Sequence, residues 1–516
     1  MADHKVTDPH TTKSIVSPQH FELSPTAKTV LMCGLGLGVL CLIWIFFKDD
    51  QFHTRFWTSI LHNSVFFTGI ALFALFKYAA GVTAWGGWFV TFKRIWEAYT
   101  QFLVVGLILM LFIAGGLWMG YHHLYHWNET SVRTSDAVIK GKSGFLSKGF
   151  YTLFTIIAMG VWIYLAKKIR SISLDEDENG DATYSHHKQL RKFAAISLPA
   201  IGFMSAACIW LWVMSLDAHW YSTMFAWYSS ASLFVSMLAL TVGIVLYMKS
   251  KGYLQEVTKE HLHDLGKFVF AFSIFWTYLW FSQYMLIWYA NVGEETTYFR
   301  KRFDHYKVLY YANLVMNFLL PFLILMRNDT KRKIGTLIFV AGLVFLGHWV
   351  DFFQMTKPGP LETAHELMQE RKEVGAKVEK LETKAMAVHE SGAEAAKQDG
   401  VVKTDTASSE MKQLTAMADS NSKESKMTIE AGTAKSTPEG GEGHGEKSPE
   451  GEGEHEGHDA AGGYVPGFTI PGLLDLGVML GFLSGFLLFV FGQISKANLQ
   501  PKNDPYYGES LHHHVI

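Results

Sequence analysis

Runs of about 20 apolar residues recur along most of the chain, with short polar turns between them. A helix of about that length crosses the hydrocarbon core of a bilayer, and only helices and closed barrels can satisfy their backbone there. A large soluble core would not produce so many evenly spaced runs. We therefore predict an all-α polytopic membrane protein with about ten transmembrane helices. The predicted spans are 28–47, 57–79, 102–125, 149–168, 193–216, 223–248, 265–289, 305–326, 333–353 and 470–492.

Two spans end in similar sequences. Tyr125–Thr130 and Trp288–Thr296 both place aromatic residues before Asn and Glu-Thr, at the end of the third and of the seventh span. The second and sixth spans also run in the same direction. This repeat predicts two parallel four-helix bundles, with the first and last spans peripheral. The predicted divisions are 1–27, 28–56, 57–216, 217–353, 354–469, 470–492 and 493–516.

Lys and Arg are roughly twice as frequent near the span ends on the side of the N-terminus as on the other side. The positive-inside rule then places both termini in the cytoplasm. The 354–469 loop faces outward. Its first part, 361–390, is rich in helix formers, whereas 391–463 has the composition of a solvated linker.

Residues 80–101 are ambiguous between an interfacial amphipathic helix and a bent continuation into the third span. Because Lys93, Arg94 and Glu97 lie near the end of this stretch, we favour the interfacial helix.

The composition excludes several kinds of site. The net charge of −2 does not favour nucleic-acid binding. The three cysteines form no Cys-x-x-Cys motif, so we expect no iron–sulfur cluster, zinc site or c-type haem in this chain. The histidines lie near predicted span ends rather than in facing pairs, so we expect no haem b. The sequence therefore predicts no metal bound by this chain.

Titratable residues gather at the outward ends of the predicted spans. Asp217 and His219 occupy the tight turn 215–230, and His348 shares a helix face with Asp351 three positions later. A cluster of carboxylates and imidazoles can pass protons. An ordinary polar rim with a helix N-cap is the alternative. The other members expected at this surface are Glu294, Glu295, Asp304 and His305.

Polar residues at helical spacing run inside three spans. They either join helices to one another or line a hydrated path from the outer cluster to Asp264, which follows His261 and His263 at the start of the seventh span. The stripes are Ser229, Ser232 and Ser236; Ser273, Thr277 and Gln283; and Tyr306, Tyr310, Asn313 and Asn317. Aromatic residues around Trp280 and Tyr284 suit a flat quinone ring, although helix packing explains them as well.

Three stretches, 215–225, 261–267 and 275–296, resemble the F subunits of bacterial alternative complex III. These belong to the polysulfide-reductase (NrfD-like) family of membrane subunits. The resemblance covers about residues 25–355 and 465–500. It points to Asp217, His219, His261, Asp264, Gln283, Glu294 and Glu295.

The resemblance implies a subunit of a quinol-oxidising complex that binds no redox cofactor itself. Haem c and iron–sulfur clusters would then lie in partner subunits, beside a sister NrfD-like subunit and, in some complexes, a terminal oxidase. The other possibilities are a quinol-binding catalytic subunit of the same family, a proton-coupled transporter and a structural scaffold. Because the charges are predicted at span ends, the transporter is disfavoured.

Overall fold

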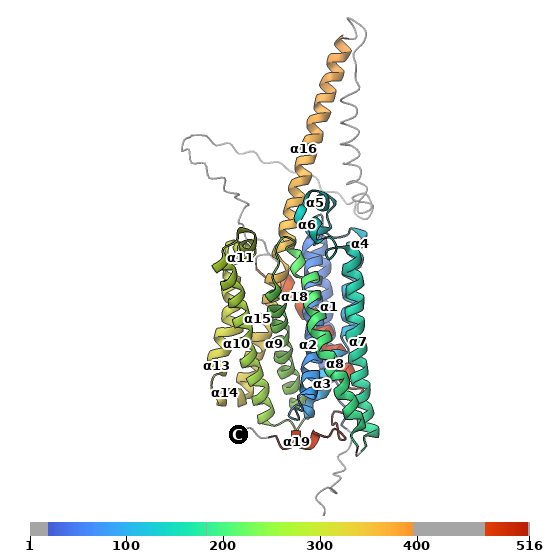
Figure 1. The fold of residues 1–516 in the computed structure, drawn as a ribbon, viewed down its shortest axis with the longest axis vertical. Helices are drawn as coiled ribbons and strands as arrows, with labels where there is room; N and C mark the ends of the chain where they lie inside the picture. Colours follow the sequence, from blue (N-terminus) through green and yellow to red (C-terminus); the bar gives the residue numbers. More distant parts are fainter. Residues whose placement is uncertain (1–18, 182, 396–469, 514–516) are drawn as a thin grey trace, which may run out of the picture. The chain divides into compact units, whose positions relative to one another are not determined.

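The computed structural model describes residues 19–181, 183–395 and 470–513 (Figure 1). Within these ranges the regular structure is helical, apart from one isolated bridge between His20 and Asn498. Ten helical segments are long and apolar enough to cross a membrane. The prediction of an all-α, multi-pass membrane protein is therefore confirmed.

The membrane-crossing segments lie close to the predicted spans. They are α1 (Pro25–Lys48), α2 (Thr54–Thr83), α3 (Lys93–Thr100) with α4 (Leu103–Met119), α7 (Lys148–Asn179), α8 (Ser185–Trp212), α9 (Thr223–Ser250), α10 (Lys259–Ala290), α12 (Lys307–Leu314) with α13 (Leu320–Leu325), α15 (Ile334–Thr356) and α18 (Leu473–Ile494). Shorter elements connect them: η1 (Val90–Phe92), η2 (His126–Asn128), α5 (Thr130–Ser135), α6 (Ala137–Lys142), η3 (Met214–Leu216), α11 (Gly293–His305), η4 (Val315–Leu319), α14 (Asn328–Arg332) and α19 (Tyr507–Leu511).

The spanning helices pack in two sets of four. In the first set α2 packs against α4 and α8, and α7 packs against α4 and α8. In the second set α9 packs against α10 and α15, and the α12–α13 segment contacts both α10 and α15. We call these the first and second bundles. Helices α2 and α9 contact each other where the bundles meet.

Helices α1 and α18 form a separate pair beside the first bundle. A Cβ added to Gly38 would lie 2.4 Å from the Cα of Gly481, so only glycine allows the two backbones to come this close. Such small residues are typical of membrane helix pairs because close backbones gain van der Waals contact. At one end of these helices, the N-terminal segment pairs with the residues after α18 through His20 and Asn498. We call this the terminal end, and the other the opposite end.

Residues 80–101 do not form an interfacial helix, so that prediction is wrong. Helix α2 continues to Thr83, and η1 and α3 lead into α4 as one spanning segment from Val90 to Met119. Lys93, Arg94 and Glu97 are buried because carboxylates and a serine from α7 and the C-terminal segment surround them. These three charged residues are therefore buried in ion pairs and hydrogen bonds, whereas the sequence predicted that they would be exposed at the membrane surface.

The ninth span ends later than predicted. Helix α15 runs to Thr356, and the residues from Gly347 to Lys357 are all buried. Lys357, placed in the outer loop by the sequence, donates to the hydroxyls of Thr58 (3.1 Å) and Ser59 (2.9 Å). It also lies 3.6 Å from the Asp475 carboxylate.

Among the described residues, 362–395 belong to a second unit, separate from the one that contains the spanning helices. The predicted helix at 361–390 is present within α16 (Pro358–Ala395). The predicted linker 391–463 lies outside the described residues beyond Ala395.

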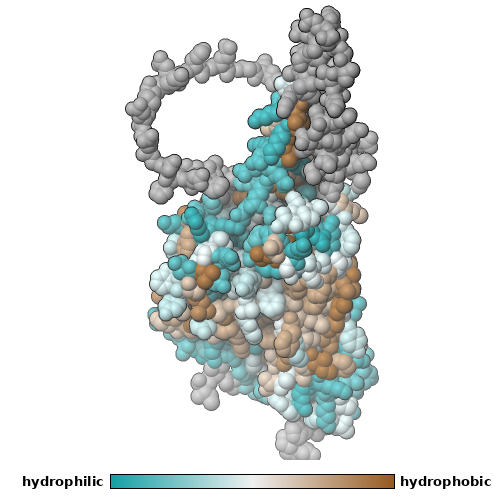
Figure 2. Space-filling model, turned by 45° about the horizontal axis from the view of Figure 1, so that its top comes forward, coloured by the Kyte–Doolittle hydropathy of each residue, from teal (hydrophilic) through white to brown (hydrophobic). Residues whose placement is uncertain are grey.

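Apolar side chains gather in a band on the face of the helices in Figure 2, with polar residues toward both ends. Large apolar side chains such as Phe203, Val308 and Leu473 are strongly exposed. Lipid would cover such residues in a membrane protein.

Candidate functional site

A buried carboxylate, Asp351, lies inside the second bundle and is 1% exposed. Its oxygens accept hydrogen bonds from Ser232 Oγ (2.8 Å), Trp276 Nε1 (2.9 Å) and Asn313 Nδ2 (2.7 Å). A fourth hydrogen bond comes from the Tyr228 hydroxyl. These donors stand on α9, α10 and α12, so all four members of the second bundle meet at one carboxylate on α15.

The charge environment of Asp351 is unusual for a buried acid. All four donors are neutral, and no Lys or Arg of the described chain forms an ion pair with Asp351 within 4 Å. Burying a carboxylate is costly unless its oxygens are hydrogen-bonded. Here the hydrogen bonds satisfy the carboxylate without a permanent positive charge, so binding a proton breaks no ion pair.

His348 lies one turn before Asp351 on α15 and is fully buried. Its Nδ1 lies 3.0 Å from Ser232 Oγ, which donates in turn to Asp351. Because Ser232 has one proton, the arrangement with both contacts satisfied places a proton on His348 Nδ1. The other ring nitrogen, Nε2, has no hydrogen-bond partner among the described residues. The three side chains form a continuous chain of hydrogen bonds.

The segment opposite His348 departs from an α-helix. Residues Val315–Leu319 form a π-helical turn, followed closely by Pro321. Pro321 cannot donate to the carbonyl of Asn317, four residues earlier, and its ring would clash there in a regular α-helix. The π turn relieves that conflict, and such turns are frequent at functional sites. It also holds Asn317, which donates to Asn313 Oδ1 at 2.6 Å.

Gly347 makes room for this turn on the facing helix. A Cβ at position 347 would lie 2.2 Å from Asn317 Oδ1 and 3.0 Å from the Met316 Cβ. The sequence therefore places a proline on one helix and a glycine on the other to bring Asn313 and Asn317 toward Asp351. We call Asp351, His348, Tyr228, Ser232, Trp276, Asn313 and Asn317 the Asp351 site.

A small pocket lies beside Tyr228. Its lining residues are Tyr228, Trp280, Gln283, Tyr298, Phe299, Arg302, Tyr310, Gln354 and Met355. The cavity measures about 20 Å³, which is enough for about one water molecule. Gln283 Nε2 and the Tyr310 hydroxyl have no partner among the described residues, so a water there would satisfy them. Trp280 lines this pocket, whereas Tyr284 packs against Phe299 and Phe303.

Arg302 joins this pocket to the opposite end of the bundle. Its guanidinium stacks over the Tyr298 ring and donates to the Gln354 carbonyl at 3.0 Å. It also lies 3.6 Å from Asp217, which forms a second ion pair with Lys301 at 3.2 Å. Asp217 is therefore held by two cations at the edge of the second bundle.

The other residues expected in the outer cluster are not beside Asp217 and Asp351. His219 contacts Asp136 of the first bundle's connecting segment at 2.5 Å, and this hydrogen bond lowers the pKa of Asp136 to about 2. Glu294 and Glu295 occupy the first turn of α11, where Glu294 is exposed. Asp304 and His305 are also exposed. The prediction of one surface cluster is wrong because Asp351 and His348 lie inside the bundle instead.

The terminal-end group forms around Asp264. Asp264 pairs with Lys267 at 2.9 Å and with His513 at 2.7 Å. His261 accepts from the backbone N–H of Thr258 and caps the start of α10, and His263 is buried beside them. Asp264 and Trp276 are twelve positions apart on α10, about 18 Å along the helix. Among the described residues, no continuous chain of hydrogen bonds links the two groups.

The sequence indicated Asp351, His348 and the stripes of Ser and Asn residues as candidate site residues. It predicted Asp351 and His348 at the outer surface rather than inside the bundle. It missed Tyr228 and Trp276 as partners of Asp351, and Arg302 as the cation beside the pocket. It also missed Lys77, a buried lysine on α2 whose ammonium lies 3.7 Å from the Phe268 ring centroid. The sequence does contain a signal for this residue, because Lys77 is a single lysine within an apolar run.

Histidines were predicted at span ends, which is wrong for His62 as well as His348. His62 is buried in α2, and its Nε2 lies 3.0 Å from the Trp349 carbonyl.

No known family model matches the chain, and no curated protein is significantly similar to it.

Proposed function

We propose that the chain is a membrane subunit of a respiratory complex that oxidises quinol and passes electrons to a cytochrome c or similar acceptor. It binds no redox cofactor of its own and contributes a proton path through the second bundle. The partners are a sister NrfD-like subunit, an iron–sulfur subunit and multihaem c subunits in a bacterial inner membrane, with both termini cytoplasmic. The resemblance of 215–225, 261–267 and 275–296 motivates the choice of complex.

One observation supports the proton path above all. Asp351 is a buried carboxylate whose four partners are neutral donors. A carboxylate inside a membrane is expensive to keep, and ionisable residues in that position are commonly functional. Because Asp351 lacks a permanent cationic partner, it can gain and lose a proton while its neighbours stay in place.

The proposed transfer uses hydrogen bonds that already exist. In the direction that this tautomer of His348 supports, His348 Nδ1 releases its proton to Ser232 Oγ as Ser232 delivers its own proton to Asp351, and His348 takes up a proton at Nε2. The protonated Asp351 then passes a proton to the Tyr228 oxygen as the Tyr228 hydroxyl releases its own proton to the water-sized pocket. One proton has then crossed the site, each group has the number of protons it began with, and the His348 proton has moved from Nδ1 to Nε2.

A quinol-binding subunit is the second candidate, since Trp280, Gln283 and Arg302 surround a pocket in the expected place. Its cavity of about 20 Å³ is far below the 300 Å³ or more of a typical small-molecule site. A quinone ring would need the lining side chains to move apart. The volume therefore favours water and protons over quinol.

A proton-coupled transporter is the third candidate. Charges at the span ends would disfavour a transporter, but Asp351 lies inside the bundle. The π turn beside Pro321 also interrupts a spanning segment, as transporter helices often do.

Purification in mild detergent through a tag on this chain separates these candidates. We expect iron–sulfur and multihaem c subunits to co-purify and a reduced haem c spectrum to appear. A colourless protein purified alone would overturn the redox-complex proposal and put the transporter first. A tagged, unrelated multi-pass protein from the same membranes is the control for non-specific co-purification.

A further inference from the structure

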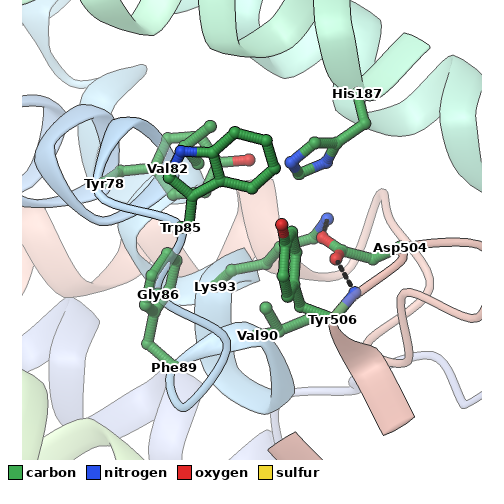
Figure 3. Close-up of a pocket in the computed structure, with 10 residues that line it drawn as sticks. All are labelled: Tyr78, Val82, Trp85, Gly86, Phe89, Val90, Lys93, His187, Asp504 and Tyr506. Atoms are coloured by element: carbon green, nitrogen blue, oxygen red, sulfur yellow. Dashed lines mark hydrogen bonds and ion pairs between the residues drawn. The ribbon is translucent and has the colours of Figure 1, made fainter. Parts of the chain in front are cut away.

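Three potential metal ligands converge at the terminal end of the first bundle. They are Glu176 near the end of α7, His187 near the start of α8 and Asp504 in the C-terminal segment. One ligand atom from each lies within 4.8 Å of the others, and all three residues are buried. Figure 3 shows His187 and Asp504 entering the same pocket from different elements, with Lys93 beside them.

The polar atoms in this group are not satisfied by protein partners. Neither ring nitrogen of His187 has a hydrogen-bond partner among the described residues, and Glu176 Oε2 also has none. His187 is 7% exposed, so bulk water reaches little of it. A buried imidazole normally finds a partner for at least one nitrogen. Its Nδ1 instead lies 3.5 Å from Glu176 Oε1, too far for a good hydrogen bond.

The charges around the group are also unbalanced. Lys93 pairs with Asp504 at 2.5 Å and lies 3.9 Å from Glu176, while Arg94 pairs with Glu97 and Asp177. Arg170 adds one further cation. Three cations thus face four carboxylates, and a neutral His187 leaves an excess negative charge. Such a charge is costly in a buried place unless a cation offsets it.

We propose that Glu176, His187 and Asp504 bind a divalent transition-metal ion, with zinc as the ion that best fits the ligands. Imidazole nitrogen and carboxylate oxygen are both zinc ligands, and three protein ligands plus water complete a tetrahedron. Ligand atoms around zinc lie about 3.5 Å apart, so the three side chains need to close by about 1 Å. This site revises the sequence prediction of no bound metal.

The Asp504 carboxylate keeps acceptor positions that an ion could occupy. Its Oδ1 accepts from Tyr506 at 3.0 Å and its Oδ2 pairs with Lys93. A carboxylate has about four acceptor positions, so these contacts leave room for an ion.

The metal would fasten the C-terminal segment across the terminal end of the bundles. Asn503 donates to the Asp177 carbonyl at 2.9 Å, and Ser510 donates to the Trp88 carbonyl at 3.0 Å. Farther along, His513 reaches Asp264 at the start of α10. The ion is therefore the proposed anchor of a segment that contacts both bundles.

The test uses the full-length protein, purified in detergent, stripped with a chelator and dialysed against Zn²⁺. We expect the wild type to retain about one equivalent of zinc more than His187→Ala, measured by elemental analysis. His186→Ala is the matched control, because the neighbouring His186 pairs with the exposed Asp175 and belongs to no such group. It should bind as much zinc as the wild type. Equal zinc in His187→Ala and wild type would overturn the proposal, since the remaining histidines would then account for it.

A second measurement keeps the test independent of variant folding. Zn²⁺ should raise the melting temperature of the stripped wild type and of His186→Ala, and Co²⁺ should give a visible absorption spectrum that Zn²⁺ abolishes. A wild type whose melting temperature is unchanged by Zn²⁺, and which gives no Co²⁺ spectrum, would also overturn the proposal.

Discussion

Two buried groups, the Arg94 group in the first bundle and the Asp351 site in the second, stabilise their carboxylates in different ways. In the first, Arg94 pairs with Glu97 and Asp177, and Ser173 donates to Glu97 at 2.7 Å. In the second, Asp351 receives hydrogen bonds from neutral side chains only. Both groups are hydrogen-bonded and buried, but only the first contains permanent charges of both signs.

This difference separates a structural role from a role in proton transfer. Because an arginine side chain stays protonated, the carboxylates around Arg94 depend on its positive charge. Removing any one charged member of the group leaves its partners without that ion pair. Asp351 can be neutralised by a proton without leaving any partner charged. The Arg94 group therefore joins α3 to α7, whereas the Asp351 site is suited to reversible protonation.

The largest effect is expected from Arg94→Ala. Removing the guanidinium leaves the buried Glu97 and the partly buried Asp177 without their arginine partner, which should cost about 3–5 kcal/mol of unfolding free energy. Unfolding in mixed detergent or denaturant measures it. The control is Arg300→Ala, whose side chain is exposed and forms a surface pair with Asp304, and no measurable change is expected. If both variants were equally stable, the Arg94 group would have no structural role that distinguishes it from the Asp351 site.

An intermediate effect is expected where α15 meets the π turn. In Gly347→Ala the new methyl group meets Asn317 Oδ1, and we expect a loss of about 1–3 kcal/mol through overpacking. Gly342→Ala on the same helix has open space around the new Cβ. It should be neutral or gain up to about 1 kcal/mol from helix propensity. A Gly347→Ala variant as stable as Gly342→Ala would show that the packing against the turn is loose.

The smallest effect is expected at the exposed His219–Asp136 contact. The folded pKa of Asp136, about 2, lies below its unfolded value of about 3.9. The contact therefore stabilises the fold above about pH 4 and is lost as the pH falls through about 2. Melting temperatures of wild type and His219→Ala should differ slightly at pH 5 and converge near pH 2. A difference that grows on acidification would contradict this.

The fold followed from the sequence because periodic apolar runs report membrane spans directly. The site was harder to place. The sequence predicts a span over 333–353, which places Asp351 near the outer end of that span, and the helix extends only a few residues further. Nothing local to the sequence shows that α15 continues to Thr356. The donors Tyr228 and Trp276 come from other helices, so only tertiary packing brings them to Asp351.

The sequence likewise indicated separate charged residues at 93–97 without their partners. Glu176, Asp177 and Asp504 lie far away along the chain, and pairing with them turned a predicted surface helix into a buried one. Charges that appear to exclude a segment from the interior can be buried when distant residues offset them.

The most direct test of the proposed proton path is Asp351→Asn in the proposed quinol-oxidising complex, purified and reconstituted into vesicles. Asparagine keeps the size of the side chain but cannot exchange a proton at neutral pH. We predict that the variant assembles and oxidises quinol while the number of protons moved per electron falls. His305→Ala, at an exposed position outside the site, should leave both quantities unchanged. An Asp351→Asn complex that moves as many protons per electron as the wild type would contradict the assignment of a proton path to the second bundle.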